Sequence, residues 1–217
     1  VNSKYIVVTG SNLSMTRTPD AHFAIEARHH GAKLVVLSPD FSDVSKQADW
    51  WVPVNAGMDG AFWMAVNHII LKEFYMDRQV PYFIDYLKRY SDTPFLVELD
   101  KTADGYVPGR FLRANRLARY SDVENGDWKF LIFNGPSGEA RMPQGSIGFR
   151  WQEQEGQWNL EMKDGKDGTA LDPKLTLIDD REEVLEISLI DFGGGKTFQR
   201  GVPVRYIDTA DGRVPVT

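Results

Sequence analysis

Two short apolar runs flank a helical pattern near the start of the chain. Residues 5–8 (Tyr-Ile-Val-Val) and 33–38 (Lys-Leu-Val-Val-Leu-Ser) have the composition of buried strands. Between them, Thr18 suits a helix N-cap, Pro19 suits the first helical position, and Gly31 suits the left-handed C-terminal end. This order of strand, helix and strand predicts a βαβ unit with parallel strands and a right-handed crossover.

A polar loop joins the first predicted strand to the helix. Gly10 allows close approach of a ligand to the backbone, Arg17 adds a positive charge, and the hydroxyls and amide of the loop offer hydrogen bonds. Open parallel sheets bind ligands at the carboxyl ends of their strands, where helix N–H groups can bind phosphate. The loop lacks both Gly-x-Gly-x-x-Gly and Gly-Lys-Ser/Thr. For this unit alone, a phosphate site and a well-capped helix after a polar loop are equally good interpretations.

Two later segments favour the phosphate site. The second run ends in residues 38–40 (Ser-Pro-Asp), which puts a carboxylate where such folds often bind a ribose. A third run, residues 50–54, is followed by residues 57–59 (Gly-Met-Asp), and Asp59 caps a helical pattern that extends to about Phe74. Polar residues at neighbouring strand ends therefore predict a nucleotide-like ligand.

The second half of the chain has a different pattern. A helix is predicted after Asp77, with Pro81 near its start, and short strands separated by Gly and Asp turns follow. We expect strands at residues 95–99, 128–133, 147–151, 158–162, 175–178 and 184–189. Arginines recur at positions 110, 113, 116 and 119, which favours an ion-paired or solvated face over an anion-binding one.

Composition limits what the chain can be. Its 217 residues are 42% hydrophobic, enough to bury a core in one or two domains. A net charge of −6 without a basic run argues against nucleic acid as a partner. The absence of cysteine excludes disulfides, thiolate metal sites and iron–sulfur ligation within these residues, and no histidine pair has ligand spacing. No run reaches the roughly 20 apolar residues of a membrane span. Because the chain opens almost directly into a strand, we expect it to be excised from a longer polypeptide.

Several strings in the chain resemble one large family. These strings are residues 10–12, 16–23, 38–40, 48–49, 57–59, 145–151 and 158–161. Together they are similar to the molybdopterin oxidoreductases. The narrowest of them, residues 16–22 (Thr-Arg-Thr-Pro-Asp-Ala-His) and 145–151 (Gly-Ser-Ile-Gly-Phe-Arg-Trp), resemble catalytic α subunits of membrane-bound respiratory nitrate reductases. The resemblance covers nearly the whole chain and weakens after about Leu177.

The resemblance implies that the first part of the chain holds one of two molybdopterin guanine dinucleotides that chelate molybdenum. The implied contacts are Thr9, Gly10, Ser11, Asn12, Thr16 and Arg17 along the phosphates, Ser38, Pro39, Asp40 and Ser42 at the guanosine end, and Gly57, Met58 and Asp59 in the rest of the nucleotide pocket. An aspartate such as Asp59 can accept two hydrogen bonds from a guanine edge. Met58 stands where the wider family usually has threonine, so this pocket lacks one hydroxyl.

We therefore predict a Rossmann-like three-layer αβα domain with parallel strands over residues 1–120, and a mostly β, hairpin-rich insertion over residues 121–217. The implied function is that of an internal part of a catalytic subunit that reduces nitrate to nitrite. Neither a catalytic residue nor a metal ligand is assigned, and the ligands of the iron–sulfur clusters would lie outside these residues. The chain alone is expected to be inactive.

The resemblance also implies the assembly. The partners would be the rest of the catalytic subunit, an iron–sulfur β subunit and a cytochrome b γ subunit, on the cytoplasmic face of the bacterial membrane. The segment itself would be soluble, without direct insertion into the membrane. Two alternatives remain: a molybdenum reductase for chlorate, perchlorate or selenate, and a free-standing nucleotide-binding regulatory module without redox activity.

Overall fold

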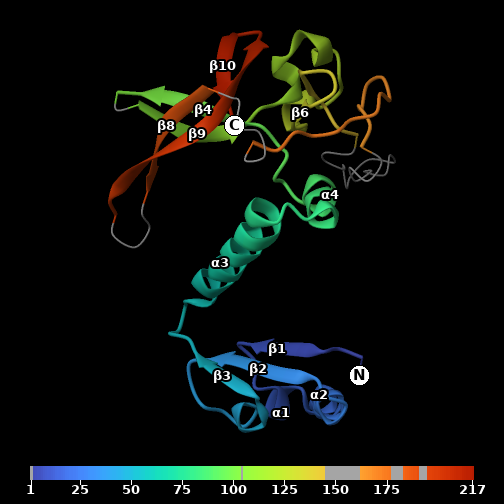
Figure 1. Ribbon diagram of the computed structural model, residues 1–217, viewed down its shortest axis with the longest axis vertical. Coiled ribbons are helices and arrows are strands. Elements are labelled where there is room, and N and C mark those ends of the chain that lie inside the picture. Colours follow the sequence, from blue (N-terminus) through green and yellow to red (C-terminus); the bar gives the residue numbers. More distant parts are fainter. Residues whose placement is uncertain (1, 104, 145–161, 177–182, 191–194) are drawn as a thin grey trace. The chain divides into compact units, whose positions relative to one another are not determined.

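The chain forms two compact units, residues 1–73 and residues 74–217, and each is described by itself. The computed structural model (Figure 1) describes residues 2–103, 105–144, 162–176, 183–190 and 195–217. The predicted strand at 147–151 lies outside the described residues, as do nearly all of 158–162 and the second half of 175–178. The division into units differs from the predicted domain boundary after residue 120, which stays a prediction about the whole subunit.

A parallel sheet of three strands organises the N-terminal unit. The strands are β1 (Tyr5–Thr9), β2 (Lys33–Ser38) and β3 (Trp50–Pro53), and their order in the sheet is β1-β2-β3. Tyr5 pairs with Lys33 and Val35 pairs with Trp50, and both pairings are parallel. Helices α1 (Leu13–Thr16) and α2 (Thr18–His29) connect β1 to β2 and lie on one face of the sheet (Figure 1). The predicted parallel βαβ unit is confirmed.

Only one face of this sheet is well covered within the unit. Its buried cluster consists of Val8, Leu34, Val36 and Val44, with Ile6, Leu13, Ala48 and Trp51 packed against it. Side chains alternate between the two faces of a strand. On the other face Tyr5, Val7 and Trp50 are 71%, 46% and 66% exposed. The expectation that the first run is a buried strand is therefore wrong for Tyr5 and Val7. No layer of the unit covers these two side chains, although Leu37, on the same face of β2, is 1% exposed.

The start of α2 differs from the sequence prediction by one residue. Arg17 precedes the first helical residue, and no side chain caps the helix. The Thr18 hydroxyl instead donates to the Ser14 carbonyl oxygen at 3.3 Å, because the short helix α1 comes immediately before it. At the other end, Gly31 has a φ of +93°, which confirms its left-handed position.

One carboxylate joins the end of α2 to the edge of the sheet. Asp49 accepts hydrogen bonds from the Leu34 backbone N–H at 2.8 Å and from Arg28 Nε at 3.2 Å, and Lys33 Nζ lies 3.5 Å away. The Leu34 N–H, followed by Arg28, lowers the pKa of Asp49 to about 2. These contacts hold the ends of three elements together.

The helices after the sheet form close to their predicted positions. Helix α3 (Asp59–Ile70) continues into a π-helical segment, η2 (Leu71–Asp77), and α4 (Pro81–Tyr90) follows. Asp59 is the first residue of α3, and Met58, not Asp59, precedes the helix. Asp77 belongs to η2 and Val80 precedes α4, so the predicted cap at Asp77 is wrong. The spacing of Phe62, Val66, Ile69 and Ile70 predicts an apolar stripe that faces a core, yet the helix has no buried residue, so this prediction is wrong within the unit.

Strands dominate the C-terminal unit. Five of them close into a barrel with the order β10-β4-β5-β8-β9: β4 (Val97–Thr102), β5 (Gly105–Phe111), β8 (Glu183–Ile190), β9 (Thr197–Thr209) and β10 (Gly212–Val216). The β5 and β8 pair is parallel and the other pairs are antiparallel. Strands β6 (Ile132–Asn134) and β7 (Glu139–Arg141) form a separate hairpin.

Four 3₁₀ turns occur in the described chain: Ser45–Gln47, Ala114–Arg116, Ala118–Tyr120 and Gly126–Trp128.

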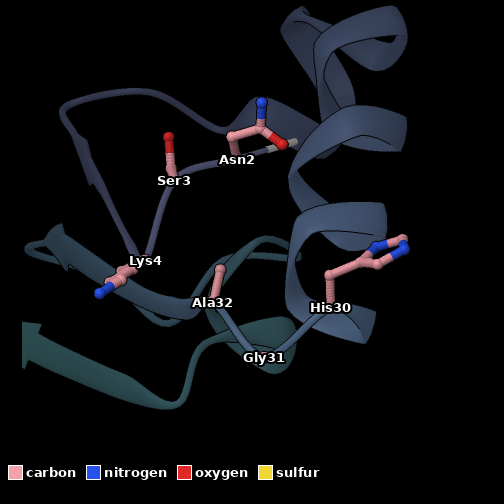
Figure 2. A pocket seen from close by; sticks show the side chains of 6 residues that line it. All are labelled: Asn2, Ser3, Lys4, His30, Gly31 and Ala32. Carbon is pink, nitrogen blue, oxygen red and sulfur yellow. The ribbon is translucent and has the colours of Figure 1, made fainter.

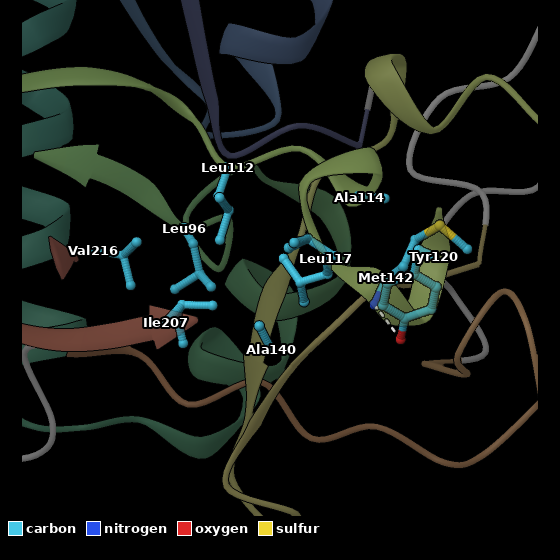
Figure 3. Packing of buried hydrophobic residues seen from close by; sticks show 10 residues of the cluster. Leu96, Leu112, Ala114, Leu117, Tyr120, Ala140, Met142, Ile207 and Val216 are labelled. Carbon is cyan, nitrogen blue, oxygen red and sulfur yellow. Dashed lines mark hydrogen bonds between the residues drawn. The ribbon is translucent and has the colours of Figure 1, made fainter. Parts of the chain in front are cut away.

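The main core of this unit surrounds Tyr120, which is fully buried among leucine, alanine and methionine side chains (Figure 3). The Tyr120 hydroxyl donates to Asp164 Oδ2 and accepts from the Met142 backbone N–H at 3.2 Å. Burial, followed by the hydrogen bond to Asp164, raises the pKa of Tyr120 to about 12. Asp164 also accepts from the Lys166 backbone N–H at 2.8 Å and lies 3.6 Å from Arg141 Nη1.

The arginine series is largely ion-paired, as predicted. Arg116 pairs with Glu98 and Arg119 pairs with Asp167. The Arg113 guanidinium lies 4.2 Å from the centre of the Phe130 ring. These arginines therefore join segments of the C-terminal unit to one another. Their contacts do not indicate an anionic partner.

The Asp49 contacts predict an acid-sensitive N-terminal unit. Because the folded-state pKa is lowered from 3.8 to about 2, the stability that the carboxylate contributes is present above pH 4 and is lost as the pH falls toward 2. We expect Asp49→Asn to lower the melting temperature at pH 7 by a few degrees, with a difference from wild type that shrinks below pH 4. Melting curves across pH measure this. Asp43→Asn, which removes a surface pair with Lys46, is the control.

The buried tyrosine gives a second prediction. Tyr120→Phe leaves Asp164 without a hydroxyl donor and the Met142 N–H without its acceptor. We expect the free energy of unfolding of the C-terminal unit to fall by about 1–3 kcal/mol, measured by urea unfolding. The control is Tyr206→Phe, which removes a solvent-exposed hydrogen bond to Glu183. Equal effects of the two variants would contradict a structural role for the buried pair.

Candidate functional site

The sheet brings the three polar loops together at one end of its strands, the carboxyl end. Thr9 pairs with Leu37, and Ser38 pairs with Pro53, so the three strands end close together. Because all the strands are parallel, the loop after each strand leaves from the same edge. The geometry therefore gathers the predicted contact residues, although their roles in cofactor binding stay a prediction.

The loop after β1 has an unpaired acceptor. Gly10 has a φ of +58°, and a Cβ atom there would meet nothing within 4 Å, so the backbone is open to a close ligand. The Asn12 carbonyl oxygen accepts from the backbone N–H and the hydroxyl of Thr16, at 2.9 and 3.0 Å. Among the described residues, the buried Asn12 Oδ1 atom has no hydrogen-bond partner. A buried polar atom is costly without a partner, so a ligand donor would stabilise this loop.

Arg17 supplies the positive charge of the same loop. Its side chain is 69% exposed, and its Nη1 lies 3.5 Å from Asp20 Oδ2. A long, exposed contact of this kind is weak. The guanidinium is therefore free to turn toward an anionic group at little cost.

The loop after β2 is arranged around an inward-facing serine. Ser38 is 7% exposed, and its hydroxyl donates to the Asp40 carbonyl oxygen at 2.7 Å. The same hydroxyl accepts from Trp51 Nε1 at 3.1 Å. Pro39 and Asp40 are exposed, and the Ser42 backbone N–H donates to the Asp40 carbonyl at 3.1 Å. Asp40, and not Ser38, presents its polar side chain to solvent.

The loop after β3 presents the third predicted group. Gly57 has a φ of +82°, and the Met58 backbone N–H donates to the Asn55 carbonyl at 3.0 Å. Met58 is 52% exposed and immediately precedes α3, of which Asp59 is the first residue. Asp59 is exposed, so its carboxylate is available to a ligand at this edge.

These residues fit a nucleotide. The loop after β1 offers the Arg17 cation to phosphates, although its Gly10 N–H already donates to the Leu37 carbonyl oxygen at 3.3 Å. Asp40 and Asp59 would offer acceptors for the ring N–H and amino group of guanine. Within the described parts of the chain, no group of three or more His, Cys, Asp or Glu could hold a metal ion. The described helices also include none that is long and apolar enough to cross a bilayer.

A separate hollow lies at the opposite end of the strands, before β1 and β2 begin (Figure 2). It has a volume of about 390 Å³ and is lined by Asn2, Ser3, Lys4, His30, Gly31 and Ala32. These residues precede β1 and β2, whereas the predicted contacts follow the strands. The hollow is therefore separate from the predicted cofactor contacts.

Sequence reasoning missed two residues that support the unit. Trp51 contacts the Ser38 loop, next to the predicted contacts. Asp49 holds α2 to the starts of β2 and β3, at the opposite end of the strands. The alternation of β3 places Trp51 on the covered face and Trp50 on the open one, which period-2 reasoning could have indicated.

Comparison with known proteins identifies the class. The sequence pattern of the molybdopterin oxidoreductase family matches residues 1–195, and the chain belongs to this family. It is 41% identical to the respiratory nitrate reductase 1 alpha chain of Escherichia coli strain K12 over 97% of this chain and 18% of that protein. It is 44% identical to the nitrate reductase alpha subunit of Mycobacterium tuberculosis strain H37Rv over 94% of this chain and 17% of that protein. The perchlorate reductase subunit alpha of Dechloromonas aromatica is less similar, at 34% identity over 68% of this chain and 14% of that protein.

The unpaired Asn12 side chain makes a prediction about the free chain. Removing a buried acceptor that has no partner relieves the cost of burying it. Asn12→Ala should therefore keep or raise the free energy of unfolding, and lower it by no more than about 0.5 kcal/mol. The matched control is Asn134→Ala, because the Asn134 amide donates to Ser137 Oγ at 2.9 Å and accepts from the Asp172 N–H at 2.8 Å. We expect that variant to lose about 1–3 kcal/mol in urea unfolding. A comparable loss in Asn12→Ala would show that Asn12 already has a partner within the protein.

Proposed function

We propose that this chain is an internal part of the catalytic subunit of a molybdenum-dependent nitrate reductase, where it holds part of the bis-molybdopterin guanine dinucleotide cofactor. The observation that carries the proposal is the gathering of three polar loops at one edge of a parallel sheet. Support comes from the family and from relatives at 41–44% identity that are named nitrate reductase alpha chains or subunits. The chain spans less than a fifth of their length.

The residues of this chain bind and orient the cofactor. Arg17 and the N–H groups around Gly10 hold phosphate oxygens, and Asn12 Oδ1 accepts a hydrogen bond from the ligand. Asp40 and Asp59 accept from the guanine edge. When bound, the cofactor supplies the molybdenum chemistry that removes oxygen from nitrate. We assign no catalytic residue here, and we expect the chain alone not to reduce nitrate with reduced viologen.

The open apolar face of the sheet supports a Rossmann-like three-layer arrangement in the whole subunit. Tyr5, Val7 and Trp50 are exposed on that face, and α3 carries apolar side chains without burying any of them. Sheets of parallel strands are normally covered by helices on both faces. We infer that a second helical layer, of which α3 is part, covers this face.

The assembly and its location follow from the same proposal. The alpha-chain names of the relatives support a complex with further subunits. We propose an iron–sulfur β subunit and a cytochrome b γ subunit as partners, with the complex on the cytoplasmic face of the bacterial membrane. The iron–sulfur ligands of the catalytic subunit lie outside this chain, which has no cysteine.

A second candidate is a related oxyanion reductase. Perchlorate and chlorate reductase alpha subunits match at 34% and 33% identity, and each match covers about two thirds of this chain. Nitrate is favoured over these substrates because the nitrate reductase relatives are more similar and match along almost the whole chain.

Thermal stability with added nucleotides tests the proposal. We expect GDP and GMP to raise the melting temperature of the chain by a few degrees at 100 times their dissociation constants, where binding contributes about 2.7 kcal/mol. AMP and NAD should have little effect. Asp59→Ala should abolish the GDP effect, whereas Asp85→Ala, which removes a helix pair with Arg89, should retain it.

The outcomes separate the candidate functions. A rise with NAD alone would favour the free-standing regulatory module over the cofactor-binding segment. The absence of any guanine-selective rise would show that the three loops of this chain do not form a guanine site by themselves.

A further inference from the structure

The side chain of Trp51 connects the core of the N-terminal unit to the loop after β2. Its ring packs against the cluster that contains Val8, Leu34 and Val36. Its indole N–H points at Ser38, with Nε1 at 3.2 Å from the carbonyl oxygen and at 3.1 Å from the hydroxyl oxygen. One end of this side chain is therefore fixed in the core and the other holds the loop.

Ser38 passes this restraint on to the exposed residues. Its hydroxyl accepts from Trp51 and donates to the Asp40 carbonyl oxygen at 2.7 Å, so both of its hydrogen-bonding roles are used within the protein. A hydroxyl in this state, on a residue that is 7% exposed, is a poor ligand contact. It fixes the backbone at Asp40 instead.

Trp51 also holds the aromatic residue that follows. The Phe41 ring stands edge to face on the Trp51 ring, with the centroids 5.2 Å apart and an interplanar angle of 89°. Phe41 is nevertheless 57% exposed. An exposed aromatic ring beside an exposed carboxylate, at the carboxyl end of a parallel strand, offers a stacking surface and an acceptor to one planar base.

We propose that Trp51 is a positioning residue that holds Asp40 and Phe41 for the base of a guanine nucleotide. Phe41 provides the stacking surface and Asp40 the polar contact, while Ser38 acts only as the link between Trp51 and the loop. The inference rests on the proposed function for the identity of the ligand. Its structural part, that the Trp51 N–H sets the conformation of residues 38–42, does not depend on the ligand.

The test uses the 217-residue chain and a pair of neighbouring tryptophans. Trp51→Phe keeps an aromatic ring but removes the N–H donor. Trp50→Phe makes the same chemical change at the adjacent position, which is 66% exposed on the opposite face of the sheet. Amide hydrogen exchange at Asp40, Phe41 and Ser42 measures the loop, and calorimetric titration with GDP measures binding.

We expect Trp51→Phe to weaken GDP binding about three- to tenfold and to speed exchange at these amides by a similar factor, which is the size of effect that one hydrogen bond produces. Exchange at Val35 and Val36, within β2, should not change. Trp50→Phe should match wild type in both measurements. Ser38→Ala should also weaken GDP binding, because it removes the hydroxyl that links Trp51 to Asp40, although the Trp51 N–H keeps the Ser38 carbonyl oxygen as an acceptor. The double variant should be weaker by less than the sum of the two single effects, because the Ser38 hydroxyl takes part in both contacts.

The possible failures are distinguishable. If Trp51→Phe behaves like Trp50→Phe in both exchange and binding, the positioning role is wrong. If the wild-type chain binds no GDP, the proposed nucleotide site fails and the ligand part of the inference fails with it. Faster exchange in Trp51→Phe would then still support the structural part. Additive effects of Ser38→Ala and Trp51→Phe would overturn the link through Ser38.

Discussion

The parallel pairing of β1, β2 and β3 is the constraint on which the rest of the N-terminal unit depends. Parallel strands need long connections, so α1 and α2 must return the chain across the sheet before β2 can begin. The same pairing directs every strand end to one edge. Residues that are far apart in the sequence, such as Gly10 and Asp59, therefore share one edge of a sheet without any direct bond between them.

Polar contacts complement this arrangement in both units. Asp49 accepts a hydrogen bond from a backbone N–H and pairs with two cations at the start of β2 and the end of α2. Inside the C-terminal core, Asp164 likewise accepts a hydrogen bond from the Tyr120 hydroxyl. In each case a carboxylate holds together segments that apolar packing alone would leave free to slide. In the loop after β1, Asn12 Oδ1 is buried without a hydrogen-bond partner, as are a few other described atoms such as Glu98 Oε1.

The exposed apolar surfaces agree with membership of a family whose relatives are much longer. The open face of the sheet and the apolar side chains of α3 would be costly in an isolated globular protein. In a longer polypeptide they are surfaces for further packing. In the barrel of the C-terminal unit, by contrast, the sheet closes on itself, so no strand of it is left as an unpaired edge.

The sequence by itself determined the parallel βαβ unit, the left-handed Gly31, the start of α3 to within one residue, and the ion-paired arginines. Each of these depends on local composition, spacing or charge. It also indicated the family, because short sequence motifs such as residues 16–22 can be recognised without a structure. Tertiary structure decided which face of the sheet is covered, that Ser38 faces inward and Asp40 outward, and that Trp51 reaches across from β3 to hold them. The contact of Trp51 with Ser38 joins residues 13 positions apart, and propensity carries no information about such a pairing. The capping roles of Thr18 and Asp77 failed for a local reason, since neighbouring helical segments occupy those residues. Propensity does not show that another helical segment comes directly before the helix.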